Sequence, residues 1–464
     1  MNLIKFIMTV ALVPYGAHGF IRSTFTRTTA ASRKQSSSVV LSATVSAPPS
    51  EEEVVASQSL TVSSTPPSWD ELSTSLSEVL PEEEVTPVVT LYRDTNGWCP
   101  FCERVWVALR VKNIPYKEQL ISLQNKPDWY KELVPSALVP AVLFHGDDDK
   151  PERRLVWESL DILKALDEEF PSTPKMVLDT PEYQEATEML DALNTAGFTY
   201  VYANRNASLT EADKEARRME FFDELDKLDS ALGKSNGPFR LGEDFTGLDA
   251  IMVPTLERWR YQLPLTAGID ILENRPNIEK WFEGMDSFAP YSERVAGDKY
   301  SWTATNSMFL RYFGGGEDKP EVAEAIQRTD MVAEELTKSF SDDPVDDSFA
   351  VEAVAKLLSN HDAVVKDCTR DEPLSQKDVP RANDEDAADA VLRYVASIML
   401  SPSPAETVNT APLLDLSADK VPGASRAART VAARLCVPRD MGAPAAKIFR
   451  KVLSTVADRL DGKE

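Results

Sequence analysis

The sequence contains few of the residues that build disulfide frameworks and metal sites: its 464 residues include 4 cysteines and 3 histidines. So few thiols exclude a disulfide-stapled fold, and so few ligand residues leave little scope for a structural metal site. No second ligand pair exists that would make a zinc site, so we predict no metal. Two of the cysteines, Cys99 and Cys102, nevertheless lie one helical turn apart in the chain.

Basic residues are outnumbered by acidic ones, with 50 Lys and Arg against 75 Asp and Glu, which gives a formal net charge of -25. A chain this acidic is a poor general binder of nucleic acid, so we expect no nucleic-acid partner. Its length is typical of about three domains. Apolar residues make up 42% of the chain, which is enough to build packed cores.

Acidic residues are absent from the first fifty positions, and the first one is Glu51. Residues 1–19 have the pattern of a secretory signal peptide, with Lys5 ahead of an apolar run and small residues at the end. The apolar run is too short to span a bilayer, so we expect no transmembrane segment in the mature chain. Residues 20–42 are basic and rich in Ser and Thr, which is typical of an organellar transit peptide.

A signal peptide followed by a transit-like segment resembles the bipartite leader of algae with complex plastids. This resemblance implies a location in the chloroplast stroma. Plain secretion is the alternative, although a secreted protein does not need the second, transit-like half. Residues 43–85 are rich in Ser, Thr, Pro, Val and Glu, and we expect a disordered acidic linker with a short helix near Trp69–Leu80.

A strand, a turn and a helix are predicted around the cysteine pair. Val88–Tyr92 is an apolar run typical of a buried strand, and Asp94–Gly97 follows as a turn. Pro100 suits the first position of a helix, where its missing N–H is not needed. Cys99 is therefore expected at the helix N-cap, where free N–H groups and the helix dipole favour the nucleophilic thiolate.

The following segments complete a small α/β unit. Further strands are predicted at Tyr116–Ile121, Ala141–Phe144 and Leu155–Trp157. We expect a cis peptide bond between Val139 and Pro140, at the entrance to one of these strands. Ser159 opens a helix over 160–169, and its hydroxyl together with the free N–H groups there can receive an anion.

Four segments of this unit together resemble the active-site region of cysteine-type glutathione transferases, with lambda and omega as the nearest classes and dehydroascorbate reductases near by. They are Trp98-Cys99-Pro100-Phe101-Cys102-Glu103-Arg104-Val105-Trp106, Leu123-Gln124-Asn125-Lys126-Pro127-Asp128-Trp129-Tyr130-Lys131, Val139-Pro140 and Glu158-Ser159-Leu160-Asp161. The resemblance covers about half the chain. It implies an α/β thioredoxin-like domain over residues 86–172 and an all-α transferase domain over residues 173–313.

The same resemblance implies a role for each site residue, with glutathione as the co-substrate. Cys99 would form a mixed disulfide with glutathione. The glutathione-binding residues implied are Lys126 for the glycine carboxylate, Val139 with cis-Pro140 for the cysteinyl backbone, and Glu158 with Ser159 for the γ-glutamyl end. Two features depart from the family pattern: Cys102 replaces a residue that is usually not a thiol, and the loop Gly146–Arg154 is long and charged. Cys102 is either a resolving thiol or a helix-packing residue.

Residues 173–313 show helical spacing of apolar residues, at Glu182–Ala207, Thr210–Gly233, Ala250–Leu263 and Asn277–Phe288. Thr246 and Asp249 have the spacing of a capping box, a motif that glutathione transferases also carry here. The second-substrate pocket is expected between this domain and Cys99. Its candidate lining residues are Tyr200, Tyr202, Trp259 and Tyr261. Each of these taken singly is more typical of a packed core.

Residues 320–464 follow a glycine triplet and are predicted to form an additional all-α domain without a catalytic motif. Helical spacing occurs in segments 321–339, 348–359, 384–400, 424–436 and 442–460. Cys368, Cys436 and His361 are isolated and are expected to be ordinary packing or surface residues. A basic stretch between Arg426 and Lys451 is usually a solvated face but would also suit an acidic protein partner.

Three functions follow from these patterns. The leading hypothesis is an enzyme, a glutathione-dependent thiol transferase acting on a small electrophile, a disulfide or dehydroascorbate. The second is a glutaredoxin-like dithiol reductase that uses Cys102 to resolve a mixed disulfide at Cys99. The third is a non-catalytic ligand-binding or scaffold protein.

Overall fold

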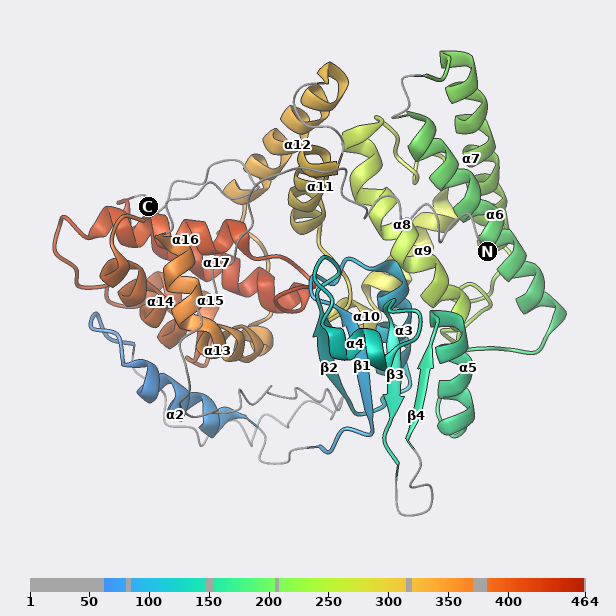
Figure 1. The fold of residues 1–464 in the computed structure, drawn as a ribbon. Helices are drawn as coiled ribbons and strands as arrows, with labels where there is room; N and C mark the ends of the chain where they lie inside the picture. The colour runs from blue at the N-terminus through green and yellow to red at the C-terminus, as the bar shows by residue number, and fades with distance from the viewer. Residues whose placement is uncertain are drawn as a thin grey trace.

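The computed structural model describes residues 62–80, 85–146, 153–204, 208–313, 319–369 and 382–462. The leader expected at residues 1–42 and the glycine triplet at 314–316 lie outside these ranges. Figure 1 shows a sheet-containing unit at the lower centre, a helical domain above it and to its right, and an orange-to-red helical extension at the left. Within the described ranges, no helix has both the length and the apolar character needed to cross a membrane.

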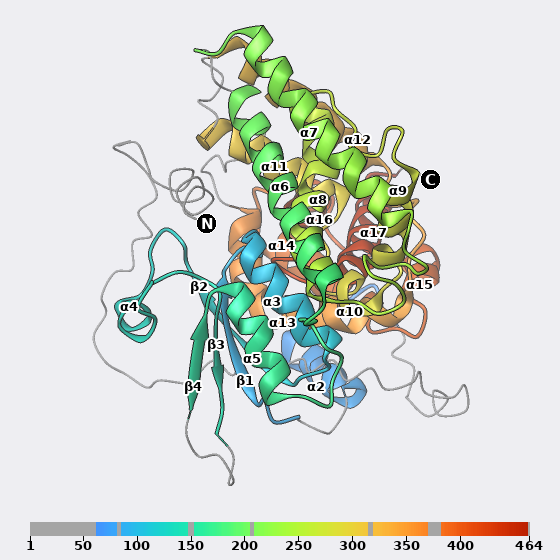
Figure 2. The same cartoon turned by 90° about the vertical axis from the view of Figure 1, so that its right-hand side faces the viewer.

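The sheet-containing unit has a four-stranded mixed sheet in the order β2-β1-β3-β4. The strands are β1 (Val89–Asp94), β2 (Tyr116–Ile121), β3 (Ala141–Phe144) and β4 (Arg154–Trp157). β1 and β2 are parallel, whereas β3 is antiparallel to both β1 and β4. Helices α3 (Pro100–Val111) and α5 (Ser159–Glu169) cover one face, and the short α4 (Asp128–Leu133) lies on the other face (Figure 2). This arrangement confirms the thioredoxin-like fold.

Burial on both faces explains why β1 is the apolar centre of this unit. All six of its residues are buried, as are Val105, Trp106 and Leu109 on the α3 surface that packs against the sheet. Two of the six residues are charged, Arg93 and Asp94; Arg93 is 1% exposed and pairs with Glu118 on β2. Its guanidinium also lies 4.1 Å from the centre of the Trp106 ring, so the buried charge has both an anion and a π face as partners.

The helical domain is built around α8, which is buried along most of its length. Its helices are α6 (Pro181–Asn204), α7 (Glu211–Leu232), α8 (Gly247–Thr266), α9 (Pro276–Asp286), α10 (Ala289–Ser292) and α11 (Lys299–Phe313). The capping box of Thr246 and Asp249 is present at the start of α8. Asp249 is fully buried and also accepts a hydrogen bond of 3.0 Å from the Trp281 indole, so the capping residue of α8 is hydrogen-bonded to α9.

The extension has a hydrophobic core of its own. Its elements are α12 (Pro320–Lys338), a 3-10 turn (Asp347–Phe349), α13 (Ala350–Cys368), α14 (Glu385–Met399), α15 (Pro404–Thr410), α16 (Val421–Arg434) and α17 (Ala443–Leu460). Tyr300 and Ala304 of α11 belong to the same core, so the extension is packed onto the helical domain and is not merely tethered to it. α15 was not expected, because its seven residues are mostly polar and bury only Pro404 and Val408.

The disordered linker expected at 43–85 is wrong for residues 62–80. These residues include α2 (Trp69–Val79), the short helix expected near Trp69–Leu80, which begins with a capping box of Ser68 and Glu71. The Trp69 indole donates a 2.8 Å hydrogen bond to Asp389 on α14, and its ring stacks on His361 of α13. The polar composition indicated disorder, but the surface that receives α2 comes from the distant extension, which local patterns cannot show.

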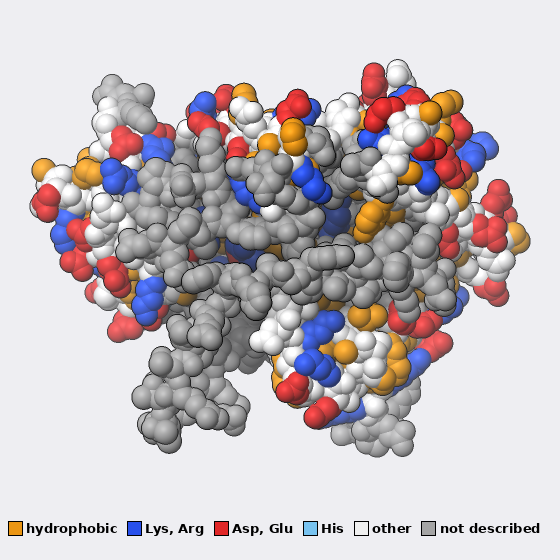
Figure 3. Space-filling view, turned by 45° about the horizontal axis from the view of Figure 1, so that its top comes forward, with side chains coloured by type: hydrophobic (Ala, Val, Ile, Leu, Met, Phe, Trp, Pro, Cys, Tyr) orange, Lys and Arg blue, Asp and Glu red, His pale blue; other side chains and the backbone are white. Residues whose placement is uncertain are grey.

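The basic stretch of the extension is not a free basic face, because most of its charges have acidic partners within the chain. The pairs are Arg429 with Asp458 and Asp461, Arg434 with Asp367, Arg439 with Asp440, and Arg450 with Asp298. Lys451 donates to the carbonyl groups of Ser341 and Asp343. Among the described residues that Figure 3 shows, acidic and basic side chains are interspersed. Docking of an acidic partner through these side chains is therefore not supported.

Candidate active site

Cys99 lies at the N-cap of α3, as the position of Pro100 predicted. Its side chain is half-buried, whereas Cys102, one turn into the helix, is 1% exposed. Both cysteines are free thiols. Their sulfur atoms and a carboxylate oxygen of Asp94 all lie within 4.8 Å of one another. The site therefore contains an accessible thiol, a buried thiol and a carboxylate.

Asp94 is a site residue that the sequence analysis had assigned only to a turn. It is the last residue of β1 and is 1% exposed. One carboxylate oxygen, Oδ2, accepts a 2.8 Å hydrogen bond from the Trp98 N–H. The other, Oδ1, is buried without a hydrogen-bond partner among the described residues. Such an orphaned acceptor is costly unless it serves a function, so Asp94 is a candidate proton acceptor in the thiol chemistry.

Burial separates the two thiols chemically. Burial raises the pKa of the Cys102 thiol well above its ordinary value, and Cys99 and Asp94 add to that effect. Cys102 is therefore a neutral thiol around neutral pH, and Cys99 is the more exposed thiol of the pair.

Three cationic side chains interact electrostatically with Cys99. Burial lowers the pKa of Lys126, and Cys99 opposes that shift. Burial lowers the pKa of Arg104 to about 10, again opposed by Cys99, so Arg104 remains protonated at neutral pH. The third cation is Arg258, which also interacts with Cys99. Together they place positive charge around the accessible thiol of the pair.

Arg258 reaches the site from α8 and joins the two transferase domains, and no local sequence pattern indicated it. Its guanidinium donates hydrogen bonds of 2.8 Å to Glu103 and 3.0 Å to the Trp98 carbonyl. It also lies 4.4 Å from the centre of the Trp302 ring. Burial raises the pKa of Glu103 to about 8, and Arg258 opposes that shift by stabilising the carboxylate. The carbonyl of Trp98, the residue before Cys99, is thus held by Arg258 from the other domain.

Four of the predicted glutathione-binding residues lie in two segments, Val139–Pro140 just before β3 and Glu158–Ser159 at the start of α5. The Val139–Pro140 bond is cis, as expected, and the Val139 carbonyl oxygen lies 4.0 Å from Cys99 Sγ. Tyr130 donates a 2.7 Å hydrogen bond to the carbonyl of Leu138, which fixes the residue before this pair. Ser159 is the buried first residue of α5, preceded by Glu158 at the N-cap. Among these residues, Val139 is in contact with the thiol.

The four aromatic candidates for the second-substrate pocket do not share one surface. Tyr200 and Trp259 are 4% and 5% exposed and both pack on Phe221 in the core of the helical domain. Tyr202 is exposed, and Tyr261 is partly buried beside Arg260. The assignment of Tyr200 and Trp259 to an open pocket is therefore wrong, because aromatic residues at helical spacing pack inward here.

The cluster at Cys99 also has to be considered as a possible metal site. The ligand atoms of Asp94, Cys99 and Cys102 are close enough to hold a thiophilic metal, but the three cations around Cys99 work against binding of a further cation.

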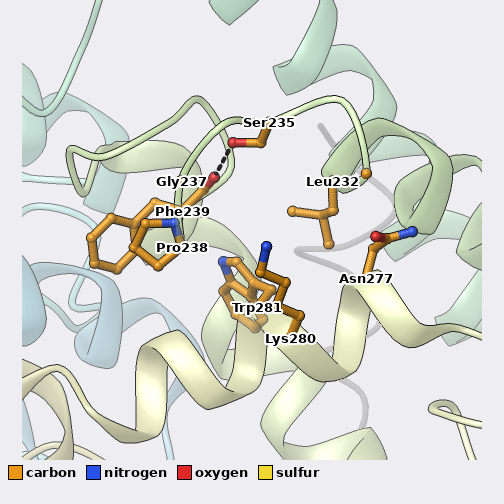
Figure 4. Close-up of a pocket in the computed structure, with 9 residues that line it drawn as sticks. Leu232, Ser235, Gly237, Pro238, Phe239, Asn277, Lys280 and Trp281 are labelled. Carbon is orange, nitrogen blue, oxygen red and sulfur yellow. Dashed lines mark hydrogen bonds between the residues drawn. The ribbon is translucent and has the colours of Figure 1, made fainter.

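A separate pocket of about 40 Å³ lies between the end of α7 and α9, lined by residues including Pro238, Lys280 and Trp281 (Figure 4). It has room for a molecule of about the size of water, not for a tripeptide.

Comparisons with known proteins match the two transferase domains. The family model "Glutathione S-transferase, N-terminal domain" matches residues 98–169, and the model "Glutathione S-transferase, C-terminal domain" matches residues 210–284. The chain is 34% identical over 198 residues to glutathione S-transferase L2, chloroplastic, of Arabidopsis thaliana. That match covers 42% of this chain and 62% of the relative, so it spans less than two thirds of that relative's length.

Two further similarities cover more of the related proteins. Over 207 residues the chain is 30% identical to a probable glutathione S-transferase DHAR1, cytosolic, of Oryza sativa subsp. japonica, covering 45% of this chain and 88% of the relative. A solved structure of dehydroascorbate reductase from Chlamydomonas reinhardtii is 21% identical with a TM-score of 0.36, covering 44% of this chain and 90% of that one. The family models do not reach residues 319–462. The chain belongs to the glutathione S-transferase family and adds a helical extension to the two domains that define it.

Proposed function

We propose that this protein is a glutathione-dependent thiol transferase whose nucleophile is Cys99. The observation that carries the proposal is a half-buried thiol at the N-cap of α3, in contact with Val139 and interacting with three cationic side chains. An accessible thiol at a helix start, with cationic side chains near it, has the placement of a thiol nucleophile.

The reaction we propose proceeds through a mixed disulfide. The Cys99 thiolate attacks the glutathione sulfur of a glutathionylated substrate, the new S–S bond forms, and the substrate leaves as a thiolate that takes up a proton. A glutathione thiolate then attacks the mixed disulfide, which releases oxidised glutathione and restores Cys99. In this second step Cys99 is the leaving group, and a sulfur that is stable as a thiolate leaves faster. Dehydroascorbate is an alternative substrate, which would be reduced by the two electrons that two glutathione molecules supply when they form oxidised glutathione.

The placement of glutathione that we propose uses the geometry around Cys99. The Val139 backbone, next to the thiol, would pair with the cysteinyl part of glutathione. The start of α5 at Ser159, behind Glu158, would receive the γ-glutamyl carboxylate, because free N–H groups at a helix N-terminus bind anions. Lys126 would meet the glycine carboxylate by charge attraction. Holding the tripeptide beside the sulfur contributes more to rate than the charge on the sulfur alone.

Mass spectrometry after incubation with oxidised glutathione tests this proposal. We expect a glutathione adduct confined to Cys99, and none on this position in the matched Cys99→Ser variant. Turnover assays with hydroxyethyl disulfide, dehydroascorbate and a phenacyl conjugate then rank the substrates. An adduct distributed over several cysteines, with no turnover in any assay, would contradict the enzyme assignment.

A dithiol mechanism is the second candidate, favoured by the contact between Cys102 and Asp94. The unpaired Oδ1 of Asp94 lies in the cluster that holds both sulfurs. In this mechanism the Cys102 thiol passes its proton to Asp94, and its sulfur attacks the Cys99 sulfur of the mixed disulfide. Glutathione leaves as the thiolate, and a Cys99–Cys102 disulfide remains for a reductant such as glutathione to open. Cys102→Ser abolishes this route and spares the first.

We propose the plastid as the location of the protein. The composition of residues 1–42 supports this, and a chloroplastic relative is consistent with it. A fluorescent reporter fused behind residues 1–42 tests it in an algal cell with a complex plastid. Accumulation of the reporter in the medium would favour the secreted alternative instead.

A further inference from the structure

The extension contributes a loop, Leu435–Met441, that contacts the turn immediately before Cys99. Gly97 in that turn is buried and has a φ of +68°. A Cβ placed on Gly97 would lie 3.0 Å from Pro438 Cγ and 3.6 Å from the Arg439 nitrogen. The loop therefore leaves no free space over this turn, and a residue without a side chain fits there best. Figure 1 shows the extension directly beside the sheet-containing unit, as this contact requires.

The loop is itself fixed by hydrogen bonds to its surroundings. Arg294 donates a 2.8 Å hydrogen bond to the Pro438 carbonyl, and the Val437 N–H donates a 2.9 Å bond to Ser301 Oγ on α11. Arg450 of α17 donates to the carbonyl of Leu435 at 2.7 Å. Every one of these partners is buried or half-buried, so Pro438 is presented to Gly97 by a rigid support.

The other side of the turn is held equally closely by the transferase domains. The Trp98 N–H donates to Asp94, and the Trp98 carbonyl accepts from Arg258. The Trp98 ring packs edge-on against Phe309 of α11, with 5.4 Å between ring centres. The peptide that carries the nucleophile is thus enclosed between three elements, one of which is the extension.

We propose that Pro438 is a positioning residue for Cys99, acting through the Gly97–Trp98 turn, so that the extension is a working part of the thiol site. The catalytic consequence rests on the proposed transferase function, but the contact itself does not. Loss of the Pro438 ring would leave space beside Gly97, and the turn would gain freedom. Small displacements of a nucleophile reduce rate strongly, because the reacting atoms must be aligned.

A double-mutant cycle with Gly97→Ala and Pro438→Ala in the full chain tests the proposal. We expect Pro438→Ala to lower kcat for hydroxyethyl disulfide reduction by about tenfold with little change in KM for glutathione. Gly97→Ala should be more damaging, because its methyl group meets Pro438 and its φ is unfavourable for alanine. In the double variant the methyl group has room, so part of the activity lost in Gly97→Ala should return.

Alkylation of Cys99 by iodoacetamide as a function of pH gives a readout that does not depend on glutathione. We expect the pH profile of this reaction to change in Pro438→Ala and to recover partly in the double variant relative to Gly97→Ala. Pro412→Ala is a control for the loss of a proline that does not contact the turn, since Pro412 is an exposed proline of the same extension whose carbonyl accepts from Tyr394. It should change neither readout.

The outcomes separate this proposal from the proposed function. Additive effects of the two substitutions, or an unchanged alkylation profile and kcat in a folded Pro438→Ala protein, would overturn the positioning role. A changed alkylation profile without glutathione turnover in any variant, including the wild type, would leave the positioning role standing and remove the transferase function.

Discussion

Cys99 and Cys436 show how differently two cysteines behave at two helix ends of the same chain. Cys99 is half-buried at the start of α3, near three cations and the Asp94 carboxylate. Cys436 follows α16, is 8% exposed, and has Thr305 as its polar neighbour at 3.9 Å. Burial raises the pKa of the Cys436 thiol. The local environment, and not the presence of a thiol beside a helix, therefore distinguishes a reactive cysteine from a packed one.

The largest expected difference between the two regions is in turnover. Cys99→Ser removes the attacking sulfur and should lower glutathione-dependent activity by about 10³-fold or more. Cys436→Ser changes a residue with no part in the reaction and should leave activity within about twofold of the wild type, provided that the buried hydroxyl is tolerated. Equal losses of hydroxyethyl disulfide turnover in both variants would contradict the distinction between the two cysteines.

The ion pair behind Cys99 should matter far more for stability than a surface pair. The Arg258 and Glu103 side chains are 15% and 3% exposed, and Arg258→Ala leaves the Glu103 carboxylate buried without this partner. We expect a loss of about 3–5 kcal/mol in the free energy of unfolding, measured by urea denaturation at a pH above about 8, where Glu103 is ionised, and a smaller loss at neutral pH, where burial keeps Glu103 largely protonated. Arg218→Ala, which breaks an exposed pair with Glu215 on α7, is the matched control and should have no measurable effect. A similar midpoint for both variants would show that the junction is not held by Arg258.

A smaller effect is expected from the buried thiol of the pair. If Cys99 works alone, Cys102→Ser should keep activity within about threefold of the wild type, because monothiol transfer needs no second sulfur. If the pair works as a dithiol, Cys102→Ser should lose most of its disulfide reductase activity. Asp94→Asn should then lose activity as well, since it removes the proton acceptor. Matching losses in these two variants would replace the leading mechanism by the dithiol one.

The finest distinction concerns which thiols react at a given pH. A pKa raised by burial keeps Cys102 and Cys436 protonated as the pH rises through the usual thiol range, so both should resist alkylation near about pH 7 to 8. Brief iodoacetamide treatment followed by peptide mass spectrometry should therefore label Cys99 alone among these three. In denaturant at the same pH, all of them should react at similar rates. Early labelling of Cys436 in the native protein would contradict its assignment as a packed residue.

Local patterns were sufficient for the parts of the site that are built from neighbouring residues. Pro100 placed Cys99 at a helix N-cap, and the spacing of Thr246 and Asp249 located the start of α8. The cis bond before Pro140 was expected from the position of this proline at the entrance to a strand. In each case the physical cause lies within a few residues of its effect, so the sequence carries it directly.

Contacts between distant segments could not be predicted in this way. Arg258 meets Glu103 across two domains, and Pro438 meets Gly97 from the far end of the chain. The sequence indicated only weakly that Asp94 belongs to the site. It is the last residue of a buried strand, and the helix that carries Cys99 starts a few residues later. The roles of Lys126, Glu158 and Ser159 remain predictions that binding measurements must test.

The position of α2 sets a limit on how the protein can be matured. Leu72 and Leu76 of α2 belong to the core of the extension, and Arg393 holds the carbonyl groups of Pro66 and Pro67 just before it. A protease that trims the leader and cuts beyond Val79 would remove these groups and open an apolar surface on α13 and α14. Burying a leucine contributes about 1.5–3 kcal/mol, so such a cut would weaken the extension considerably. The processing site compatible with this fold therefore lies upstream of Val62, which belongs to the same core.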